Sequence, residues 1–339
     1  MKIHIDFVHL PNVNFFKNLI RILENNGHEI ILTAQKRGRL PQILEKELPN
    51  YNIKAFGKHR GTLFSIIFES NFFRFFKMFL FVLKNRPDLG LNVGSFPQEI
   101  SMGLLRIPNI TISDDPERKY DFFFHNIFAT NVLFPPIIKK TGKYKTFNAL
   151  KEWAYLSPKY FEPNSKTLDY YNVKEKEYIF IREVSTGSMN YLSQESGLIL
   201  SFANLFPKDI KVLFSLEDKS KVNLYPKSWT LLQEPIEDIH SLLYYSKIVI
   251  SSGDSMAREG AMLGVSSVYC GIREMKANDI MIKSKSLHKV DSKDVLDFIN
   301  NKYYDENDCL NQDIFREKLM ADWDDVNAFV IDIINERIK

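Results

Sequence analysis

Short apolar strands alternate with helical segments along almost the whole chain, and this alternation constrains the fold more than any other feature of the sequence. A strand at residues 2–7 is followed by a helix at 15–26, whose apolar residues recur at helical spacing. Further strands are predicted near residues 28–33, 51–55, 88–93, 109–113 and 129–133. Strands and helices in this order predict a parallel sheet with Rossmann-like winding.

The alternation stops near residue 150 and starts again near residue 178. The stretch between is rich in charged residues and contains Pro158 and Pro163, which is typical of a linker. New strands are predicted near residues 178–181, 210–215, 229–232, 247–250 and 266–269. The fold class is therefore α/β, with two Rossmann-like domains whose parallel sheets would face each other across a cleft.

These patterns predict the domain boundaries. We expect an N-terminal domain at residues 1–157, a linker at 158–176 and a C-terminal domain at 177–318. The last segment, 319–339, belongs to a helical region that is long enough to pack back on the N-terminal domain.

Composition excludes several classes of protein. The formal net charge of +3 is too small to indicate nucleic-acid binding. The two cysteines, Cys270 and Cys309, make no disulfide framework and belong to no Cys/His cluster, so no metal site is expected. Residues 1–6 read as a strand rather than a signal peptide, and no run of about eighteen apolar residues exists. We therefore expect a cytoplasmic location.

The clearest candidate site follows the predicted strand at 247–250. Ser252 and Gly253 allow a tight turn, and Asp254 or Ser255 is expected to cap the helix that follows. A helix start behind such a turn offers N–H donors to an anion such as a phosphate. Glu259, about one turn into the helix, could accept hydrogen bonds from the sugar hydroxyls of a nucleotide. The alternative is an ordinary βα turn with a charged outer helix face and no ligand.

Other residues are expected at the carboxyl ends of the strands. Arg182 follows the first strand of the second half, and its guanidinium suits a pyrophosphate; Arg273 lies in a loop after a later strand. In the first half, Asp114, Asp115 and Glu117 could supply a general base for an acceptor hydroxyl, or could simply cap a helix. Loops of the first half also offer acceptor-side candidates, namely His9, Asn12, Asn14 and Ser95.

One long helix, or two, rich in phenylalanine is predicted at residues 62–86, and the segment at residues 72–84 is distinctly two-sided. Its Phe and Leu side chains gather on one half of the helical wheel, and Arg74, Lys77 and Lys84 gather on the other. This pattern fits a peripheral helix lying on an anionic membrane. It also fits the commoner case, in which the apolar half covers a sheet and the basic half faces solvent.

Several long matches give the chain a family resemblance. The most specific are residues 253–264, GDSMAREGAMLG, and residues 241–245, SLLYY, with further matches at 1–6, 27–29 and 151–156. On these segments the chain resembles the proteins grouped as domain of unknown function 354 (DUF354), which are related to GT-B glycosyltransferases and non-hydrolysing UDP-N-acetylglucosamine 2-epimerases.

The resemblance implies a GT-B architecture that holds a nucleotide-sugar mainly in its C-terminal half. It implies that Gly253, Asp254, Ser255 and Met256 bind the diphosphate and that Glu259 binds the ribose, with Arg182, Ser252 and Arg273 nearby. Where a Pro-His-Val-His-Phe-Phe loop is expected, this chain has Asn12 and Asn14 in place of both histidines. Where the family turn usually has two glycines, only Gly253 remains.

We therefore expect a metal-independent glycosyltransferase, with a UDP-linked sugar as substrate and no cofactor, acting in polysaccharide or glycolipid synthesis. Its partners would be a nucleotide-sugar donor and a sugar or lipid-linked acceptor. The alternatives are a 2-epimerase-like isomerase, which the loss of both histidines disfavours, and a non-catalytic nucleotide-sugar binder.

Overall fold

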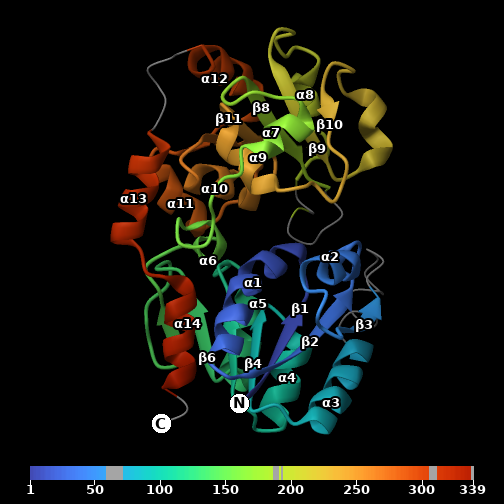
Figure 1. The fold of residues 1–339 in the computed structure, drawn as a ribbon, viewed down its shortest axis with the longest axis vertical. Coiled ribbons are helices and arrows are strands. Elements are labelled where there is room, and N and C mark those ends of the chain that lie inside the picture. Colours follow the sequence, from blue (N-terminus) through green and yellow to red (C-terminus); the bar gives the residue numbers. More distant parts are fainter. Residues whose placement is uncertain (59–71, 186–190, 192–193, 305–310, 337–339) are drawn as a thin grey trace. The chain divides into compact units, whose positions relative to one another are not determined.

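A computed structural model describes residues 1–58, 72–185, 191, 194–304 and 311–336 (Figure 1). The first part of the predicted Phe-rich region, residues 62–71, lies outside the described residues. The chain divides into two compact units. One comprises Met1–Tyr155 and Trp323–Lys339, and the other comprises Leu156–Asp322.

The described part of the first unit contains a seven-stranded parallel sheet in the order β3-β2-β1-β4-β5-β6-β7. Its strands are β1 Lys2–Phe7, β2 Glu29–Lys36, β3 Lys54–Lys58, β4 Leu89–Val93, β5 Asn109–Ile112, β6 Asn131–Phe134 and β7 Tyr144–Thr146. The central strands are almost wholly buried, as their apolar sequences predict. The strand order reverses between β1 and β4, and open α/β sheets bind ligands at such a reversal.

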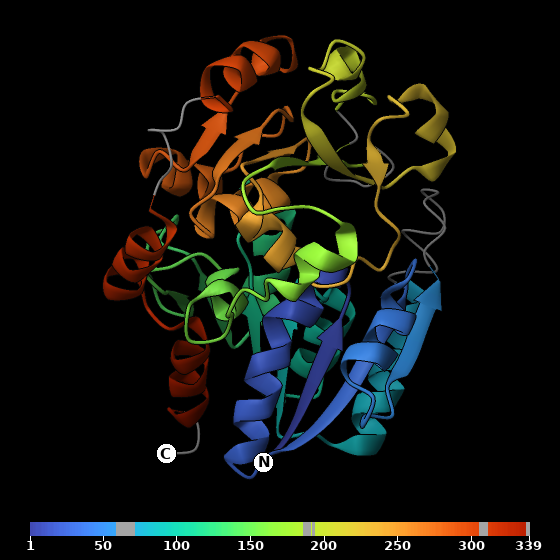
Figure 2. The same ribbon diagram turned by 45° about the horizontal axis from the view of Figure 1, so that its top comes forward.

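Helices cover both faces of this sheet. They are α1 Leu10–Asn25, α2 Leu40–Glu47, α3 Phe73–Asn85, α4 Phe96–Leu104, α5 Lys119–Phe128, the short α6 Trp153–Leu156 at the unit boundary, and α14 Val326–Asn335. In Figures 1 and 2, α1 lies in front of the strands, whereas α4 and α5 lie behind them. Helix α4 packs against α3 on one side and α5 on the other, so these three helices form one layer.

Helix α1 begins earlier than its apolar periodicity predicts. It starts at Leu10 instead of residue 15, with Pro11 in its first turn. Proline lacks a backbone N–H, but the first turn of a helix has no intrahelical acceptor for that group, so Pro11 does not interrupt the helix. Asn12 and Asn14, expected in a loop, therefore lie in the first turns of α1.

The described part of the second unit repeats this winding. Its six-stranded parallel sheet has the order β10-β9-β8-β11-β12-β13, which again reverses, here between β8 and β11. The strands are β8 Tyr178–Glu183, β9 Lys211–Leu216, β10 Thr230–Leu231, β11 Ile248–Ser251, β12 Ser266–Tyr269 and β13 Leu287–Lys289. The helices are α7 Lys166–Tyr171, α8 Leu200–Ala203, η3 Lys219–Leu224, α9 Ile239–Tyr245, α10 Asp254–Met262, α11 Lys276–Lys283, η4 Ser292–Asp294, α12 Val295–Lys302 and α13 Gln312–Asp322.

The C-terminal region is broken into two helices that belong to different units. Helix α13 lies in the second unit, whereas α14 lies in the first. The Asp325 side chain caps α14 by accepting from the N–H groups of Asn327 and Ala328. Asn327 then donates to the Ala154 carbonyl at 2.8 Å, which ties α14 to the first unit. Residues 158–176, expected to be a linker, belong to the second unit.

Candidate functional site

The strand reversal of the second unit lies beside the predicted anion site. In the register of the sheet, Ser251 at the end of β11 pairs with Arg182 near the end of β8. The chain then passes through Ser252 and Gly253 into α10. The start of α10 is therefore at the carboxyl edge of the sheet, where this topology places ligands.

Helix α10 is capped differently from the expectation. Its N-cap residue is Gly253, so neither Asp254 nor Ser255 caps the helix. A Cβ atom at Gly253 would lie 2.6 Å from Cγ1 of Val184, so glycine is required here by close packing. The turn is braced by hydrogen bonds: Ser252 Oγ accepts from Val184 N, and Ser251 Oγ accepts from Gly253 N. With no side chain at the N-cap, the first-turn N–H groups remain oriented towards the helix entrance.

Asp254 is held by basic and hydroxyl groups. Its carboxylate accepts from Arg258 at 3.0 Å and from the Tyr191 hydroxyl, and it lies 3.7 Å from the Arg273 guanidinium. A carboxylate in this position repels an anionic ligand. The Asp254 carboxylate therefore lies beside Arg273 at the entrance of α10 and is not itself suited to contact a diphosphate.

The charged side of α10 does not face solvent. Arg258 is fully buried and also donates to Asn278 at 2.9 Å, and Asp254 is only 2% exposed. The opposite side packs on the sheet, since a Cβ atom at Gly260 would lie 2.6 Å from Ser267 Oγ. The charged face expected on the outside of this helix is therefore buried, not solvated.

Glu259 lies one turn into α10 and faces a histidine. Its Oε2 atom is 3.6 Å from Nε2 of His240, and both side chains are largely buried. His240 lies in the first turn of α9, and its ring contacts the ring of Phe161 edge-on. The ring contact packs the imidazole against Phe161, beside the Glu259 carboxylate.

The Arg182 side chain is held by neighbouring residues of the second unit. Its guanidinium donates to Ser215 Oγ at 2.8 Å and to the Glu217 carboxylate. Its backbone carbonyl accepts from Ser252 N, so the residue helps to shape the turn. The Glu217 partner offsets the positive charge that was predicted to meet a pyrophosphate.

A hollow in the second unit adjoins the ends of β8 and β9. It is lined by Glu183, Val184, Ser185, Ser196, Gly197, Leu216, Asp218, Lys221 and Tyr225. Burial raises the pKa of Glu183, which accepts from the Tyr225 hydroxyl at 2.8 Å and from Ile199 N at 3.0 Å. Glu183 therefore anchors one wall of the hollow.

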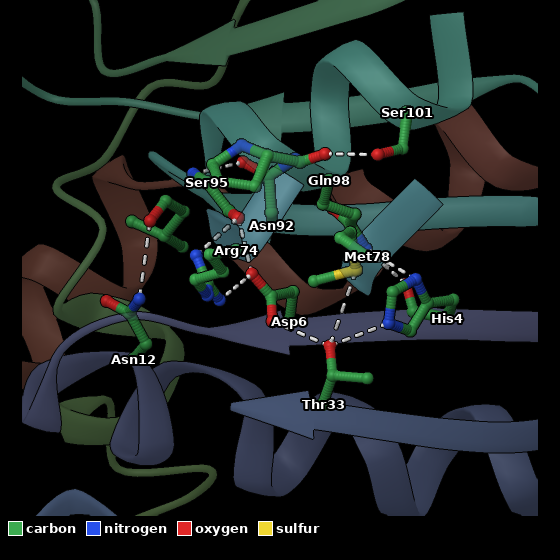
Figure 3. Close-up of polar contacts among 12 residues, drawn as sticks. His4, Asp6, Asn12, Thr33, Arg74, Met78, Asn92, Ser95, Gln98 and Ser101 are labelled. Atoms are coloured by element: carbon green, nitrogen blue, oxygen red, sulfur yellow. Dashed lines mark hydrogen bonds and ion pairs between the residues drawn. The ribbon is translucent and has the colours of Figure 1, made fainter. Parts of the chain in front are cut away.

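The first unit has a buried polar network beside its own strand reversal (Figure 3). Asp6 on β1 pairs with Arg74 of α3 at 2.5 Å, and both side chains are almost wholly buried. Ser95, at the N-cap of α4, donates its hydroxyl to Asp6 and its backbone N–H to Asn92. The network ties α3 and α4 to β1 and β4.

His4 extends this network along β1. Gln98 Nε2 faces the His4 and Leu91 carbonyls and also His4 Nδ1, so Nδ1 carries no proton (Figure 3). Nε2 therefore donates to Thr33 Oγ1 at 2.8 Å, and Thr33 donates to Asp6 at 2.6 Å. Burial lowers the pKa of His4 to about 4, which keeps the imidazole neutral.

The three acidic candidates in the first unit differ in their surroundings. Asp114 is buried and forms an ion pair with Lys151 at 2.7 Å, whereas Glu117 is exposed. Asp115 does not cap α5, because the helix begins at Lys119 behind Arg118. The backbone N–H of Asp115 instead contacts Ser113 Oγ at 3.4 Å, within the turn that follows β5.

The acceptor-side candidates also differ in their burial and in their partners. Ser95 and Asn12 are buried, and Asn12 Nδ2 donates to the Val93 carbonyl at 3.3 Å, beside the strand reversal. His9 is exposed at the N-cap of α1 and accepts from Arg37 at 2.9 Å. Asn14 is half-buried within α1.

Sequence reasoning did not single out Arg74, Tyr191 or Lys151. Arg74 was assigned to a solvated basic face, but it is 1% exposed. A signal was present, since Arg74, Met78 and Val82 recur at helical spacing and form the buried stripe of α3. No local pattern marks Tyr191 or Lys151, whose partners are distant in the sequence.

The described residues contain no group of three His, Cys, Asp or Glu side chains arranged to hold a metal ion. In the same part of the chain, no helix has the length and apolar character needed to cross a membrane.

The family model described as protein of unknown function DUF354 matches residues 1–339. The chain belongs to this family. An uncharacterized protein of Methanocaldococcus jannaschii is 23% identical to it over 319 residues, which span 89% of this chain and 91% of the relative.

Solved structures share this DUF354 member's fold. The UDP-GlcNAc 2-epimerase of Methanocaldococcus jannaschii, in complex with UDP-GlcNAc and UDP, is similar with a TM-score of 0.66 and 13% identity, over 95% of this chain and 99% of that chain. The spinosyn forosaminyltransferase SpnP is similar with a TM-score of 0.66 and 11% identity, over 98% of each chain. The expected fold class, an α/β fold with two parallel sheets like those of GT-B transferases and 2-epimerases, is confirmed.

Proposed function

We propose that this DUF354 protein is a nucleotide-sugar-dependent glycosyltransferase of GT-B type that acts in polysaccharide or glycolipid synthesis. The proteins with this fold include glycosyltransferases and UDP-GlcNAc 2-epimerases, some of them bound to UDP-GlcNAc. What these neighbours have in common is the use of a nucleotide-sugar.

The observation that carries the proposal is the arrangement around α10. The start of α10, which has no side-chain cap, and the buried Glu259 carboxylate belong to the turn and helix that follow β11, and the Arg273 guanidinium reaches Asp254 at this helix start from the loop after β12. The N–H groups of Ser255 and Met256 and the charge of Arg273 suit a diphosphate, and Glu259 suits ribose hydroxyls. Helix dipole and guanidinium would stabilise a leaving nucleotide diphosphate without a bound metal ion.

The acceptor chemistry is assigned to the first unit. Asp114, Asp115 and Glu117 follow β5, and one of these carboxylates would accept the proton of the attacking hydroxyl. Asp114 is held in place by Lys151, which favours a fixed general base over a mobile one. The first unit would then receive a sugar or lipid-linked acceptor, and the second unit a UDP-linked donor.

A 2-epimerase-like isomerase is the alternative that the shared fold supports. Epimerisation needs acid and base groups on both sides of the sugar ring, and the asparagines at positions 12 and 14 do not serve as such groups at neutral pH. A third possibility is a protein that binds nucleotide-sugars without converting them.

One incubation series distinguishes the three. Purified protein is mixed with UDP-GlcNAc and a panel of other nucleotide-sugars, with and without a mixture of sugar and lipid-linked acceptors, and products are followed by mass spectrometry and NMR. A transferase releases UDP only when an acceptor is present. A new epimer without acceptor establishes the isomerase, and binding without conversion establishes the third class. Absence of any thermal shift across the panel would contradict all three.

A further inference from the structure

Helix α3 is oriented opposite to the common pattern for a Phe-rich helix. The stripe packed on the sheet is Arg74, Met78 and Val82, whereas Phe76 is 49% and Leu80 is 63% exposed. Phe75, Phe79 and Phe81 are half-buried, and the Phe81 ring contacts His4 of β1 and Phe56 of β3, so the phenylalanines cover the sheet only in part. The rest of the apolar half of the helix faces outward, with Phe72, Phe73 and Leu83 also exposed.

The same layer exposes a second apolar stripe. On α5, Tyr120, Phe123 and Ile127 are separated by three and four residues, so they share one side, and all three are more than half exposed. Leu104, at the end of α4 between the two helices, is exposed as well. We call these nine side chains the α3–α5 face: Phe72, Phe73, Phe76, Leu80, Leu83, Leu104, Tyr120, Phe123 and Ile127.

The charges around the α3–α5 face are mostly of one sign. The exposed charged side chains within the described helices α3, α4 and α5 are Lys77, Lys84 and Lys119. The acidic residues of these helices, Glu99 and Asp121, are buried. Arg86, Arg106 and Arg118 add exposed cations at the helix ends, and two exposed carboxylates, Asp88 and Glu117, lie just outside the helices.

On the α3 wheel, Lys77 and Lys84 border the exposed phenylalanines on one side. Aromatic and leucine side chains beside lysines match the interface of an anionic bilayer, where apolar groups enter the acyl boundary and the ammonium groups meet lipid phosphates. A protein partner with an apolar surface would not require this excess of positive charge.

We infer that the α3–α5 face is a peripheral docking surface for membranes that contain anionic lipids. The inference stands apart from the proposed sugar chemistry, because it rests on the outward residues of one helix layer. It would nevertheless bring the first unit to a surface where lipid-linked acceptors are found.

Vesicle flotation tests the inference with the full chain and no nucleotide. We expect the protein to float with phosphatidylcholine vesicles that contain phosphatidylglycerol, and to float less with pure phosphatidylcholine or at high salt. The double variant F76S/L80S should bind the anionic vesicles at least about tenfold more weakly, because two exposed apolar side chains no longer enter the bilayer. The variant K77E/K84E should also weaken binding, by about fivefold or more for each charge replaced.

The matched control is Tyr170→Ser with Leu205→Ser, which removes two exposed apolar side chains of the second unit. This control should float as the parent does. Failure of the parent to bind anionic vesicles, or equal loss in the control, overturns the inference. Light scattering completes the test: if F76S/L80S converts a dimer to a monomer and vesicle binding is unchanged, the face joins two copies of the chain and the lipid assignment is wrong. Circular dichroism of each variant reports whether it is folded.

Discussion

The Nε2 atom of His240 lies 3.6 Å from the Oε2 atom of Glu259, and this pair links α9 to α10 inside the second unit. A carboxylate beside an imidazole can be oriented for a ligand without the loss of its own acceptor capacity, because each oxygen offers two lone-pair directions. We regard His240 as a positioning residue for Glu259.

This relationship predicts a graded effect on nucleotide binding. His240→Asn should raise the Kd for UDP by roughly threefold to tenfold, the loss expected when one polar neighbour no longer orients the carboxylate. His240→Gln, with a longer side chain, should recover part of the affinity. Isothermal titration calorimetry measures both, and an unchanged Kd in His240→Asn would show that the pair has no part in binding.

The buried ion pair of the first unit predicts an effect on stability. Arg74→Met leaves the Asp6 carboxylate buried without its cation, and should lower the free energy of unfolding by about 3 kcal/mol. Adding Asp6→Asn should restore part of that loss, because the unpaired charge is removed. Lys77→Met, on the exposed side of the same helix, should change stability by less than about 0.5 kcal/mol. Urea unfolding supplies the values; equal effects at positions 74 and 77 would contradict the buried placement of Arg74.

His4 predicts how stability depends on pH. Its pKa falls from 6.5 to about 4 on folding, so the unfolded chain binds the proton more readily between these values. Stability from this group is complete above pH 6.5 and is lost as the pH falls towards 4, by about 3 kcal/mol in total. His4→Gln should make the decline between pH 6.5 and 4.5 shallower. An identical decline in parent and variant would show that His4 is not buried in its neutral form.

The close approach of α10 to its sheet predicts a packing effect. Gly260→Ala would place a methyl group 2.6 Å from Ser267 Oγ and 2.9 Å from Val249 Cγ2, so the helix must shift. We expect a loss of about 1–3 kcal/mol in unfolding free energy, typical of overpacking. The control is Glu317→Ala on the exposed surface of α13, and a neutral Gly260→Ala would contradict the tight packing described here.

Much of the fold follows from local signals in the sequence. Continuous apolar runs such as residues 248–250 predict buried parallel strands, and small residues such as Gly260 predict close helix packing. The same signals mislead at helix starts. Pro11 fits the first turn of α1, so the expected loop around Asn12 is helical, and Gly253 caps α10 although Asp254 and Ser255 have the typical capping side chains.

The candidate site was harder to foresee, because its contacts join distant parts of the chain. The sequence locates Glu259 and Arg273, but it does not reveal that Asp254 is paired with Arg258. Charges four residues apart on a helix usually indicate a solvated pair, and here they are buried by α11 and the residues before it. Arg74 was wrongly predicted to face solvent because its partner, Asp6, is 68 residues away in the sequence.

The most direct test of the central claim is calorimetric binding of UDP and of 2′,3′-dideoxy-UDP to the parent, Glu259→Ala and Glu317→Ala. The proposed site predicts that the parent and Glu317→Ala prefer UDP by roughly tenfold or more, the contribution of ribose hydroxyls donating to a carboxylate. Glu259→Ala should bind both ligands with similar, weaker affinity. If Glu259→Ala binds UDP as tightly as the parent and still prefers it over the dideoxy analogue, the nucleotide is not held at α10.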